Sequence, residues 1–438
     1  MAHEWIEGEA MDEQFLDMVS AVDVSRLRVV NAPASTSWDF PAIPEPRIHR
    51  IHPYPAKFPA FLTSKALSYA RRAGLETKSI ADIFCGCGTV AYEARRAGVD
   101  FWGCDVNPVA TLIAKTKSGK YSPERVRSYA GLILEDLYLA NTNVDLAEAA
   151  VLKLRDWFEP DQFDDLARLL NAIKKTVPVR SRYREVFLCA FSAILKRCSQ
   201  WRQRSIKPSF DRSKKPASVK KAFESQCSFM IDAFKQSGLE LDTKQEINLA
   251  NVLTLSKPKT PVDLIITSPP YVTSYEYADL HQLSSLWLGF ASDHRDLRIG
   301  SIGSTQHNLN LGQKIDQLNL VGTQVVFALF NEDRRAARAV ANYYLDMQNV
   351  AIRCRQFVSD KGIAVFVIGN TRYCGVEIDN ASHLTEALLH AGFGKVRITR
   401  RQISNKAATP FRSNLGRFSR TETSTQIYAH EYVVIAHL

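Results

Sequence analysis

The sequence predicts an α/β fold built around a parallel sheet, and three observations lead to this prediction. Residues 79–114 read as an apolar strand, a glycine turn, a helix and a second apolar strand. A further apolar run at 262–266 stops abruptly at Thr-Ser-Pro-Pro-Tyr, which is the pattern of a buried strand that ends in polar residues. Two more apolar strands are expected at 362–370 and 431–438. Strands that alternate with helices favour βαβ units.

The first unit contains a glycine-rich turn between two expected strands. Ile80 to Phe84 should form the first strand, Thr89 to Ala97 a helix, and Phe101 to Cys104 the second strand. Gly86 and Gly88 occupy the turn, where the lack of a side chain lets the backbone approach a ligand at the helix N-terminus. This order of elements predicts that the two strands are parallel.

Two acidic residues mark the ends of these strands. Asp105 follows the second strand, where it is placed to bind the hydroxyls of a ribose. Gly86, Gly88 and Ala91 also fit the G-x-G-x-x-A pattern of dinucleotide enzymes, so an NAD-dependent oxidoreductase is an alternative. Asp82 disfavours that alternative, because its carboxylate would lie beside an anionic pyrophosphate. A ligand with a positive ammonium and sulfonium, such as S-adenosylmethionine, suits this carboxylate better.

Size and composition set wide limits. With 438 residues, 45% of them hydrophobic and 23% charged, the chain is long enough for one large domain or for two domains. The acidic N-terminus has no signal-peptide pattern and the apolar stretch at 187–195 is too short to cross a bilayer, so a cytoplasmic protein without membrane contact is expected. The eight cysteines form no pair of CxxC motifs, so no metal site is expected.

Positive charge is concentrated in two segments. The formal net charge is +10 and the sequence pI is about 9.1. Lys196–Phe223 and Arg400–Arg420 interleave Lys and Arg with aromatic and small polar residues. Such clusters suit contacts with phosphates and stacking on bases. A solvated basic surface without a partner is the alternative for each segment.

Four segments resemble the signatures of DNA amino-methyltransferases. "DIFCGCGT" is similar to their "DPFCGSGT", with Ile83 and Cys87 in place of the commoner Pro and Ser, and "GCDVNPVA" is similar to their "GxDxNP". "HPYPAKFP" is similar to "HPxxxKxP", and "SPPY" at 268–271 matches their Asp/Asn/Ser-Pro-Pro-Tyr/Phe/Trp motif. The resemblance implies S-adenosylmethionine as cofactor. It also implies a Rossmann-like class I methyltransferase fold with a mixed seven-stranded sheet, interrupted here by a helical insertion.

The resemblance also implies which residues bind the cofactor. The lead-in segment with His52 and Lys57 would contribute to the pocket for the methionine end, where Lys57 could meet the cofactor carboxylate; a salt bridge elsewhere is the alternative. An acid near the position of Asn251 contacts the adenine ring in the family, and the Asn amide can still donate or accept a hydrogen bond. The full expected set is His52, Lys57, Asp82, Phe84, Gly86, Gly88, Thr89, Asp105, Asn107 and Asn251.

The expected catalytic residues are Ser268, Pro269, Pro270 and Tyr271. An exocyclic amine is conjugated with its ring and is a poor nucleophile, so two acceptors near its hydrogens would favour the pyramidal form that can attack a methyl group. Ser268 Oγ and the Pro269 carbonyl are the candidate acceptors. The prolines stiffen the backbone, and Tyr271 offers a ring for stacking on a base extruded from the duplex. No Cys follows the prolines, so covalent C5 methylation is not expected.

The expected function is methylation of the N4 amine of cytosine in double-stranded DNA. In the family, Ser at the first motif position is typical of N4-cytosine enzymes and Asp of N6-adenine enzymes. Adenine N6 is therefore an alternative, and a DNA-binding subunit without catalysis is an alternative of another class. No nuclease signature is evident, so a restriction endonuclease partner would be a separate chain.

Four regions are expected along the chain. They are an N-terminal arm at 1–45, the cofactor half of the core at 46–118, a helical insertion at 119–243, and the catalytic half at 244–438 with a loop insertion near 291–325. The basic end of the helical insertion is the first candidate for target recognition. The polar segment 298–314 is the second candidate, because it is expected to form a loop near the catalytic residues.

Overall fold

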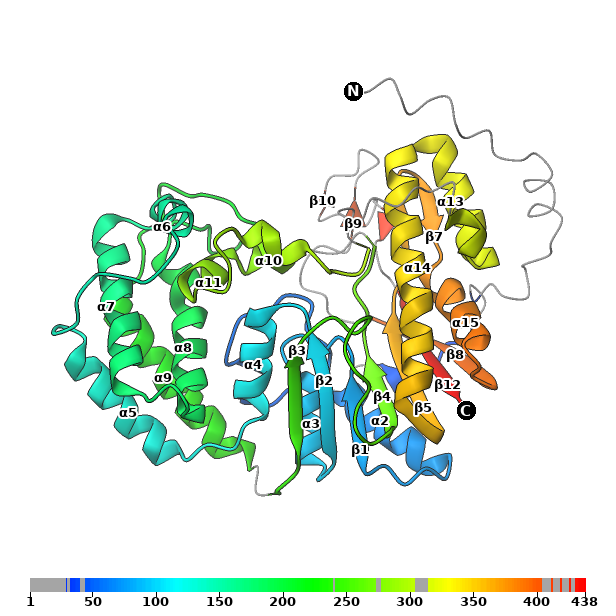
Figure 1. Ribbon diagram of the computed structural model, residues 1–438, viewed down its shortest axis with the longest axis horizontal. Helices are drawn as coiled ribbons and strands as arrows, with labels where there is room; N and C mark the ends of the chain where they lie inside the picture. The colour runs from blue at the N-terminus through cyan, green and yellow to red at the C-terminus, as the bar shows by residue number, and fades with distance from the viewer. Residues whose placement is uncertain are drawn as a thin grey trace.

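One mixed sheet of seven strands organises the molecule (Figure 1). The computed structural model describes residues 29, 32–39, 44–238, 241–272, 277–303, 314–403, 411–412, 418–419, 425–426 and 430–438. The strand order is β3-β2-β1-β4-β5-β12-β8. The first five are parallel, and β12 is antiparallel to β5 and β8. The strands are β1 (Ser79–Asp82), β2 (Asp100–Asp105), β3 (Gln245–Leu249), β4 (Val262–Thr267), β5 (Val358–Ile368), β8 (Lys395–Gln402) and β12 (His430–His437). The predicted α/β architecture with a mixed seven-stranded sheet is confirmed.

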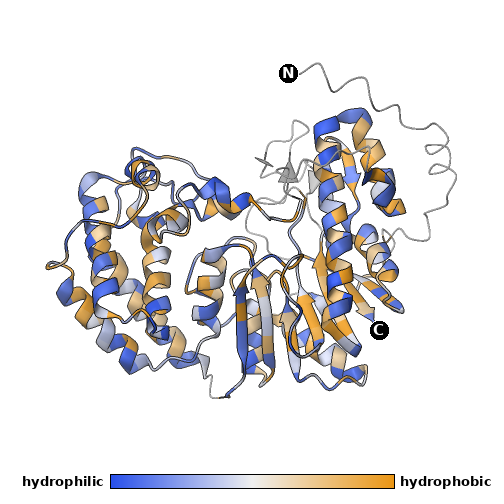
Figure 2. Cartoon of the chain, in the orientation of Figure 1, coloured by the Kyte–Doolittle hydropathy of each residue, from blue (hydrophilic) through white to orange (hydrophobic). Residues whose placement is uncertain are grey.

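Helices cover both faces of this sheet. Ile80 and Leu264 pack with residues of α2 (Ala60–Arg72) and α3 (Thr89–Arg96) on one face. Ala81 and Ile265 pack on the other face with α13 (Leu320–Glu332), α14 (Arg334–Phe357) and α15 (Asn380–His390). Successive strand residues point to opposite faces, so burial of both faces explains why the inner strands β4, β5 and β12 contain continuous apolar runs, whereas the edge strands β3 and β8 do not. Figure 2 shows these runs as orange bands through the sheet.

A helical unit beside the sheet has a separate apolar core (Figure 1). Between β2 and β3 the chain forms α4 (Pro108–Ser118), α5 (Pro123–Asp136), α6 (Glu148–Arg155), α7 (Pro160–Thr176), α8 (Arg182–Cys198) and α9 (Val219–Ser237). The aromatic rings of Phe163, Phe187 and Phe191 are buried in this core. Two short helices that follow β4, α10 (Tyr277–Leu280) and α11 (Gln282–Trp287), extend to it, and Trp287 completes the core.

The remaining elements are short. They are η3 (Thr36–Trp38), η4 (Arg47–Arg50), η5 (His294–Arg298), η6 (Ile315–Gln317), β6 (Thr371–Tyr373), β7 (Val376–Ile378), β9 (Phe411–Arg412), β10 (Phe418–Ser419) and β11 (Thr425–Gln426). Most of the basic segment 400–420 and most of the polar segment 298–314 lie outside the described residues. None of the helices that the structure describes has the length and apolarity needed to cross a bilayer. In the same part of the chain, no three His, Cys, Asp or Glu side chains are grouped to hold a metal ion.

Candidate active site

The two sequence motifs meet where the direction of the strand order reverses. β1 pairs with β2 on one side and with β4 on the other, so the connections after β1 and β4 leave the sheet in opposite directions. A crevice at the carboxyl ends of the strands is expected at such a point. The hydroxyl of Thr267, the last residue of β4, donates a hydrogen bond of 2.6 Å to Oδ1 of Asp82, the last residue of β1. The glycine turn and the Ser-Pro-Pro-Tyr motif therefore begin at adjacent strand ends.

Glycine conformation fixes the turn after β1. Gly86 and Gly88 have φ values of +46° and +73°, in the left-handed region that favours glycine. A Cβ on Gly88 would lie 2.5 Å from the Cα of Ala114 in α4, so this glycine permits close packing of the two helices. Gly86 faces Tyr54, whose hydroxyl would lie 3.4 Å from an added Cβ. Thr89, the first residue of α3, is buried directly after the turn.

A buried carboxyl group, Asp82, and a half-buried one, Asp105, flank this turn. Asp105 accepts hydrogen bonds of 2.8 Å from the backbone N–H of Gly86 and of Asn107. Asp82 accepts one of 3.1 Å from the backbone N–H of Phe84, in addition to the bond from the Thr267 hydroxyl. Burial raises the pKa of Asp82 to about 7, and the charge of Asp105 adds to this effect. Burial also raises the pKa of Asp105. Carboxyl groups with raised pKa values would be ionised more readily beside a positive charge, and they can accept hydrogen bonds from hydroxyl groups.

A polar and aromatic cluster links the turn to the helices after the Ser-Pro-Pro-Tyr motif. The side-chain oxygen of Asn107 caps α4 by accepting a 2.9 Å hydrogen bond from the N–H of Val109, and its amide nitrogen lies 3.0 Å from Nδ1 of His281. The ring of Tyr54 stacks on that of Tyr277 at 5.7 Å and lies 5.1 Å from that of His281. Sequence analysis did not assign Tyr54 or His281 to the site. An aromatic residue between the two prolines of the lead-in segment is the signal that could have identified Tyr54.

Three of the expected cofactor residues are bonded to other protein groups. His52 Nε2 lies 2.8 Å from the hydroxyl of Ser192 in α8, and burial lowers the pKa of His52 to about 4. Lys57 is ion-paired with Glu45. The salt bridge considered as an alternative for Lys57 is therefore present. Asn251 donates a hydrogen bond of 3.0 Å to the carbonyl of Gly300. The structure brings the other seven expected residues to the turn between β1, β2 and α4.

Ser268 presents its oxygen as an acceptor. Its hydroxyl donates a hydrogen bond of 2.8 Å to the carbonyl of Val367 in β5. A hydroxyl has one proton and two lone pairs, so a group that approaches Ser268 Oγ meets an acceptor. Pro269 is buried and Pro270 half-buried at the same strand end, which holds this geometry in place.

Tyr271 lies against the C-terminal strands. Its ring is 3.5 Å from the position that a Cβ on Gly369 would take, and its hydroxyl donates a long hydrogen bond of 3.5 Å to Glu431 Oε1. Glu431 is ion-paired with the buried Arg401, whose Nη2 lies 2.9 Å from Oε2. Burial and the Glu431 charge hold the pKa of Tyr271 well above its usual range. Sequence analysis did not identify this ion pair, because its two partners come from neighbouring antiparallel strands 30 residues apart.

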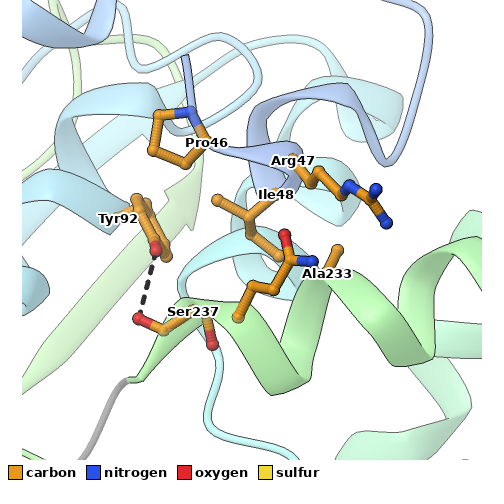
Figure 3. Close-up of a pocket in the computed structure, with 7 residues that line it drawn as sticks. Pro46, Arg47, Ile48, Tyr92, Ala233 and Ser237 are labelled. Atoms are coloured by element: carbon orange, nitrogen blue, oxygen red, sulfur yellow. Dashed lines mark hydrogen bonds between the residues drawn. The ribbon is translucent and has the colours of Figure 1, made fainter. Parts of the chain in front are cut away.

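A separate cavity of about 160 Å³ lies at the seam between the sheet and the helical unit (Figure 3). It is bounded by residues around η4, by Tyr92 of α3 and by the end of α9. The Tyr92 hydroxyl donates a 3.3 Å hydrogen bond to the carbonyl of Ser237 across it. None of the expected site residues lines this cavity.

Comparison with known proteins finds methyltransferases that are similar to most of the chain. No protein-family model matches it. The type II methyltransferase M.MvaI of Kocuria varians is 22% identical over 358 residues, which cover 74% of this chain and 76% of that protein. The type II methyltransferase M.AvaI of Nostoc sp. is 23% identical over 429 residues, covering 89% and 86%. An rRNA methyltransferase structure, aviRa of Streptomyces viridochromogenes, aligns over 95% of this chain and 93% of its own at 11% identity, but its TM-score of 0.31 adds nothing to the fold described above. The chain is thus similar to type II methyltransferases along most of its length.

Proposed function

We propose that this protein is a site-specific DNA methyltransferase that transfers a methyl group from S-adenosylmethionine to the N4 amine of cytosine. The relatives named type II methyltransferases support a methyltransferase. The observation that carries the proposal is the hydrogen bond between Thr267 and Asp82, because it joins the end of the ligand-binding strand to the end of the strand that carries Ser268. A class I methyltransferase uses adjacent strand ends of this kind for cofactor and substrate.

The chemistry of the residues at the turn fits the cofactor. Asp82 is buried with a raised pKa, so a cationic amino-acid group would stabilise its ionised form. Asp105 would accept hydrogen bonds from ribose hydroxyls, and the glycine turn leaves the backbone open to close approach. When bound, S-adenosylmethionine supplies an electrophilic methyl group.

The catalytic half would prepare the amine. Ser268 Oγ and the Pro269 carbonyl would accept hydrogen bonds from the amine hydrogens, which favours a lone pair directed out of the ring plane. As the new N–C bond forms, the sulfur–methyl bond of the cofactor would break to leave a neutral thioether, and the amine would release one proton to the solvent. Tyr271 would stack on the extruded base and so exclude water from the reacting atoms. Rate enhancement would come chiefly from positioning of the two reactants.

Cytosine N4 is proposed over adenine N6 because the first motif residue is a neutral Ser rather than an Asp. Single-molecule sequencing of DNA from cells that express the protein tests the proposal, since it reports both the modified base and its sequence context. We expect N4-methylcytosine at one recurrent motif, and a smaller fraction of modified sites in cells that express Ser268→Ala. N6-methyladenine at such a motif would replace the cytosine assignment. Unmodified DNA would favour a non-catalytic DNA-binding subunit.

A restriction endonuclease that cleaves the same motif would be a partner encoded as a separate chain. The methylated motif from the sequencing experiment provides the test, because a plasmid that contains the unmodified motif should be cut by extracts that contain such a nuclease.

A further inference from the structure

The segment Lys196–Phe223 carries the largest local excess of positive charge. It contains ten Lys or Arg residues and one acidic residue, Asp211. The other basic segment, Arg400–Arg420, is offset by acidic residues elsewhere, since the formal net charge of the whole chain is +10. A local excess of this size creates a positive potential that attracts polyanions over distances of about a Debye length, roughly 8 to 10 Å.

Two lysines of the segment hold it in a defined conformation. Lys214 Nζ donates hydrogen bonds of 2.6 and 2.7 Å to the carbonyls of Lys196 and Trp201. Lys196 Nζ donates one of 2.7 Å to the carbonyl of Ser205 and lies 5.6 Å from the ring centroid of Trp201. Burial lowers the pKa of Lys214 to about 8. Hydrogen bonds from Lys196 and Lys214 to backbone carbonyls therefore stabilise the connection between α8 and α9.

Most of the other basic side chains are exposed; Lys220 is half-buried, with its Nζ 5.1 Å from the ring centroid of Tyr138. Within the part of the chain that the structure describes, six are exposed and take part in no ion pair: Arg197, Arg204, Lys207, Arg212, Lys215 and Lys221. We call these six residues the basic surface. Arg202 is also exposed, and its guanidinium lies 3.7 Å from the carboxylate of Asp211. Exposed cations without acidic neighbours remain available to a ligand.

The basic surface is connected to the candidate active site through α6 and α11. The backbone N–H of Gln200 donates a 2.8 Å hydrogen bond to the carbonyl of Trp157, just after α6, and the rings of Trp157 and Trp201 lie 5.4 Å apart. α6 packs on α11, which follows the Ser-Pro-Pro-Tyr motif in the chain. Figure 1 shows α6, α10 and α11 on the side of the molecule toward which the strands point.

We propose that the basic surface binds the phosphate backbone of duplex DNA outside the base that is methylated. This inference rests on the proposed function. Its role would be affinity and orientation rather than reading of base edges, because phosphate contacts by Arg and Lys position a protein on DNA without specifying the sequence. Association with this surface displaces counterions from the DNA, and binding therefore weakens with salt.

The triple variant Arg204→Ala/Lys207→Ala/Arg212→Ala tests this role. Binding to a fluorescently labelled duplex DNA is measured by anisotropy over a series of KCl concentrations. Loss of three phosphate contacts should reduce the magnitude of the slope of log K against log[salt] by about 2.7. When the salt concentration rises fourfold, the association constant of the unmodified protein should therefore fall by a factor about 40 times larger than that of the variant. The KM for DNA should rise while kcat at saturating DNA is unchanged.

The triple variant Lys65→Ala/Arg71→Ala/Arg72→Ala is the matched control. It removes three exposed cations from α2, which leads toward the amino end of β1, the opposite edge of the sheet from the motifs. Its salt slope and KM should equal those of the unmodified protein. Thermal unfolding of both variants checks that the fold is retained, and Lys215→Ala/Lys221→Ala provides a second test on the same surface.

An unchanged salt slope in the basic-surface variants would overturn the inference, and so would an equal decrease in the control. A decrease seen with an RNA probe but not with duplex DNA would assign the surface to RNA instead. The binding assay involves no methyl transfer, so its outcome is separate from the proposed function. A reduced slope in a protein that methylates nothing would refute the enzyme alone, while methylation with an unchanged KM and slope would refute the basic surface alone.

Discussion

Replacement of Asp82 by Asn should make the protein more stable at neutral pH while it weakens cofactor binding. The pKa of Asp82 is about 7 in the folded protein, compared with 3.8 for an ordinary aspartate side chain. The folded protein therefore keeps this proton over a pH range in which the unfolded chain has lost it, and the free energy of unfolding falls as pH rises toward 7. Above pH 7 the carboxylate is buried and charged, and its full unfavourable contribution is present.

The magnitude follows from the pKa. Between pH 5 and about pH 7 the Asp82 carboxyl is protonated in the folded protein and ionised in the unfolded chain. Each of these two pH units is worth about 1.4 kcal/mol, so the difference in unfolding free energy between Asp82→Asn and the unmodified protein should grow by about 3 kcal/mol between pH 5 and pH 8. The comparison across pH cancels effects that do not titrate, such as the two new N–H donors of the Asn amide. Cofactor affinity of the unmodified protein should be about tenfold weaker at pH 6 than at pH 8, because only about a tenth of the molecules are then ionised at Asp82.

Urea unfolding at four pH values between 5 and 8 measures the stability difference, and isothermal titration calorimetry with S-adenosylmethionine measures binding. Thr267→Val provides a directional check, since loss of the hydroxyl that stabilises the Asp82 carboxylate should move the pH transition upward. A stability difference that is constant across pH would refute the reasoning. So would unaltered cofactor affinity in Asp82→Asn.

Three further predictions concern the motifs and their supports. Ser268→Ala should lower kcat by about 10- to 100-fold with little change in cofactor affinity, because a hydrogen bond to a group that gains charge is worth about 1.5–3 kcal/mol; an unaltered kcat would exclude a role for the hydroxyl. Gly88→Ala should lower the free energy of unfolding by more than about 2 kcal/mol, because a residue with a Cβ in the left-handed region costs about 1–2 kcal/mol and this Cβ would also clash with α4. Gly131→Ala is the control and should be neutral or stabilising, because its Cβ would meet no atom within 4 Å. Equal thermal stability of the two variants would contradict this prediction. Glu431→Gln should lower kcat more than it changes KM. If Glu431 acts through the Tyr271 hydroxyl, the substitution should lower kcat less in a Tyr271→Phe background. Fully additive effects of the two substitutions on kcat would assign Glu431 a purely structural role.

Local sequence was sufficient to predict the first βαβ unit and its glycine turn. The strand from Ile80 and the helix from Thr89 follow from short-range patterns, and the positive φ of Gly86 and Gly88 is a property that glycine favours at such a turn. The positions of Asp82 and Asp105 follow directly, because each ends a strand of a βαβ unit. These features depend on neighbours in the chain.

Side-chain partners could not be predicted in the same way. Lys57 pairs with Glu45, and His52 bonds to Ser192, which is 140 residues away in the helical unit. The Arg401–Glu431 pair depends on the register of two antiparallel strands at the far edge of the sheet. No spacing in the sequence specifies these contacts, because they depend on how the helical unit and the C-terminal strands pack against the core.

The most direct test of the central claim is nucleoside mass spectrometry of DNA incubated with the purified protein and S-adenosylmethionine that carries an isotopically labelled methyl group. The account predicts labelled N4-methylcytosine in DNA treated with the unmodified protein, and about 10- to 100-fold slower incorporation of the label with Ser268→Ala. Label in C5-methylcytosine would contradict it, as would the absence of labelled nucleosides with a DNA substrate that contains the motif found by sequencing.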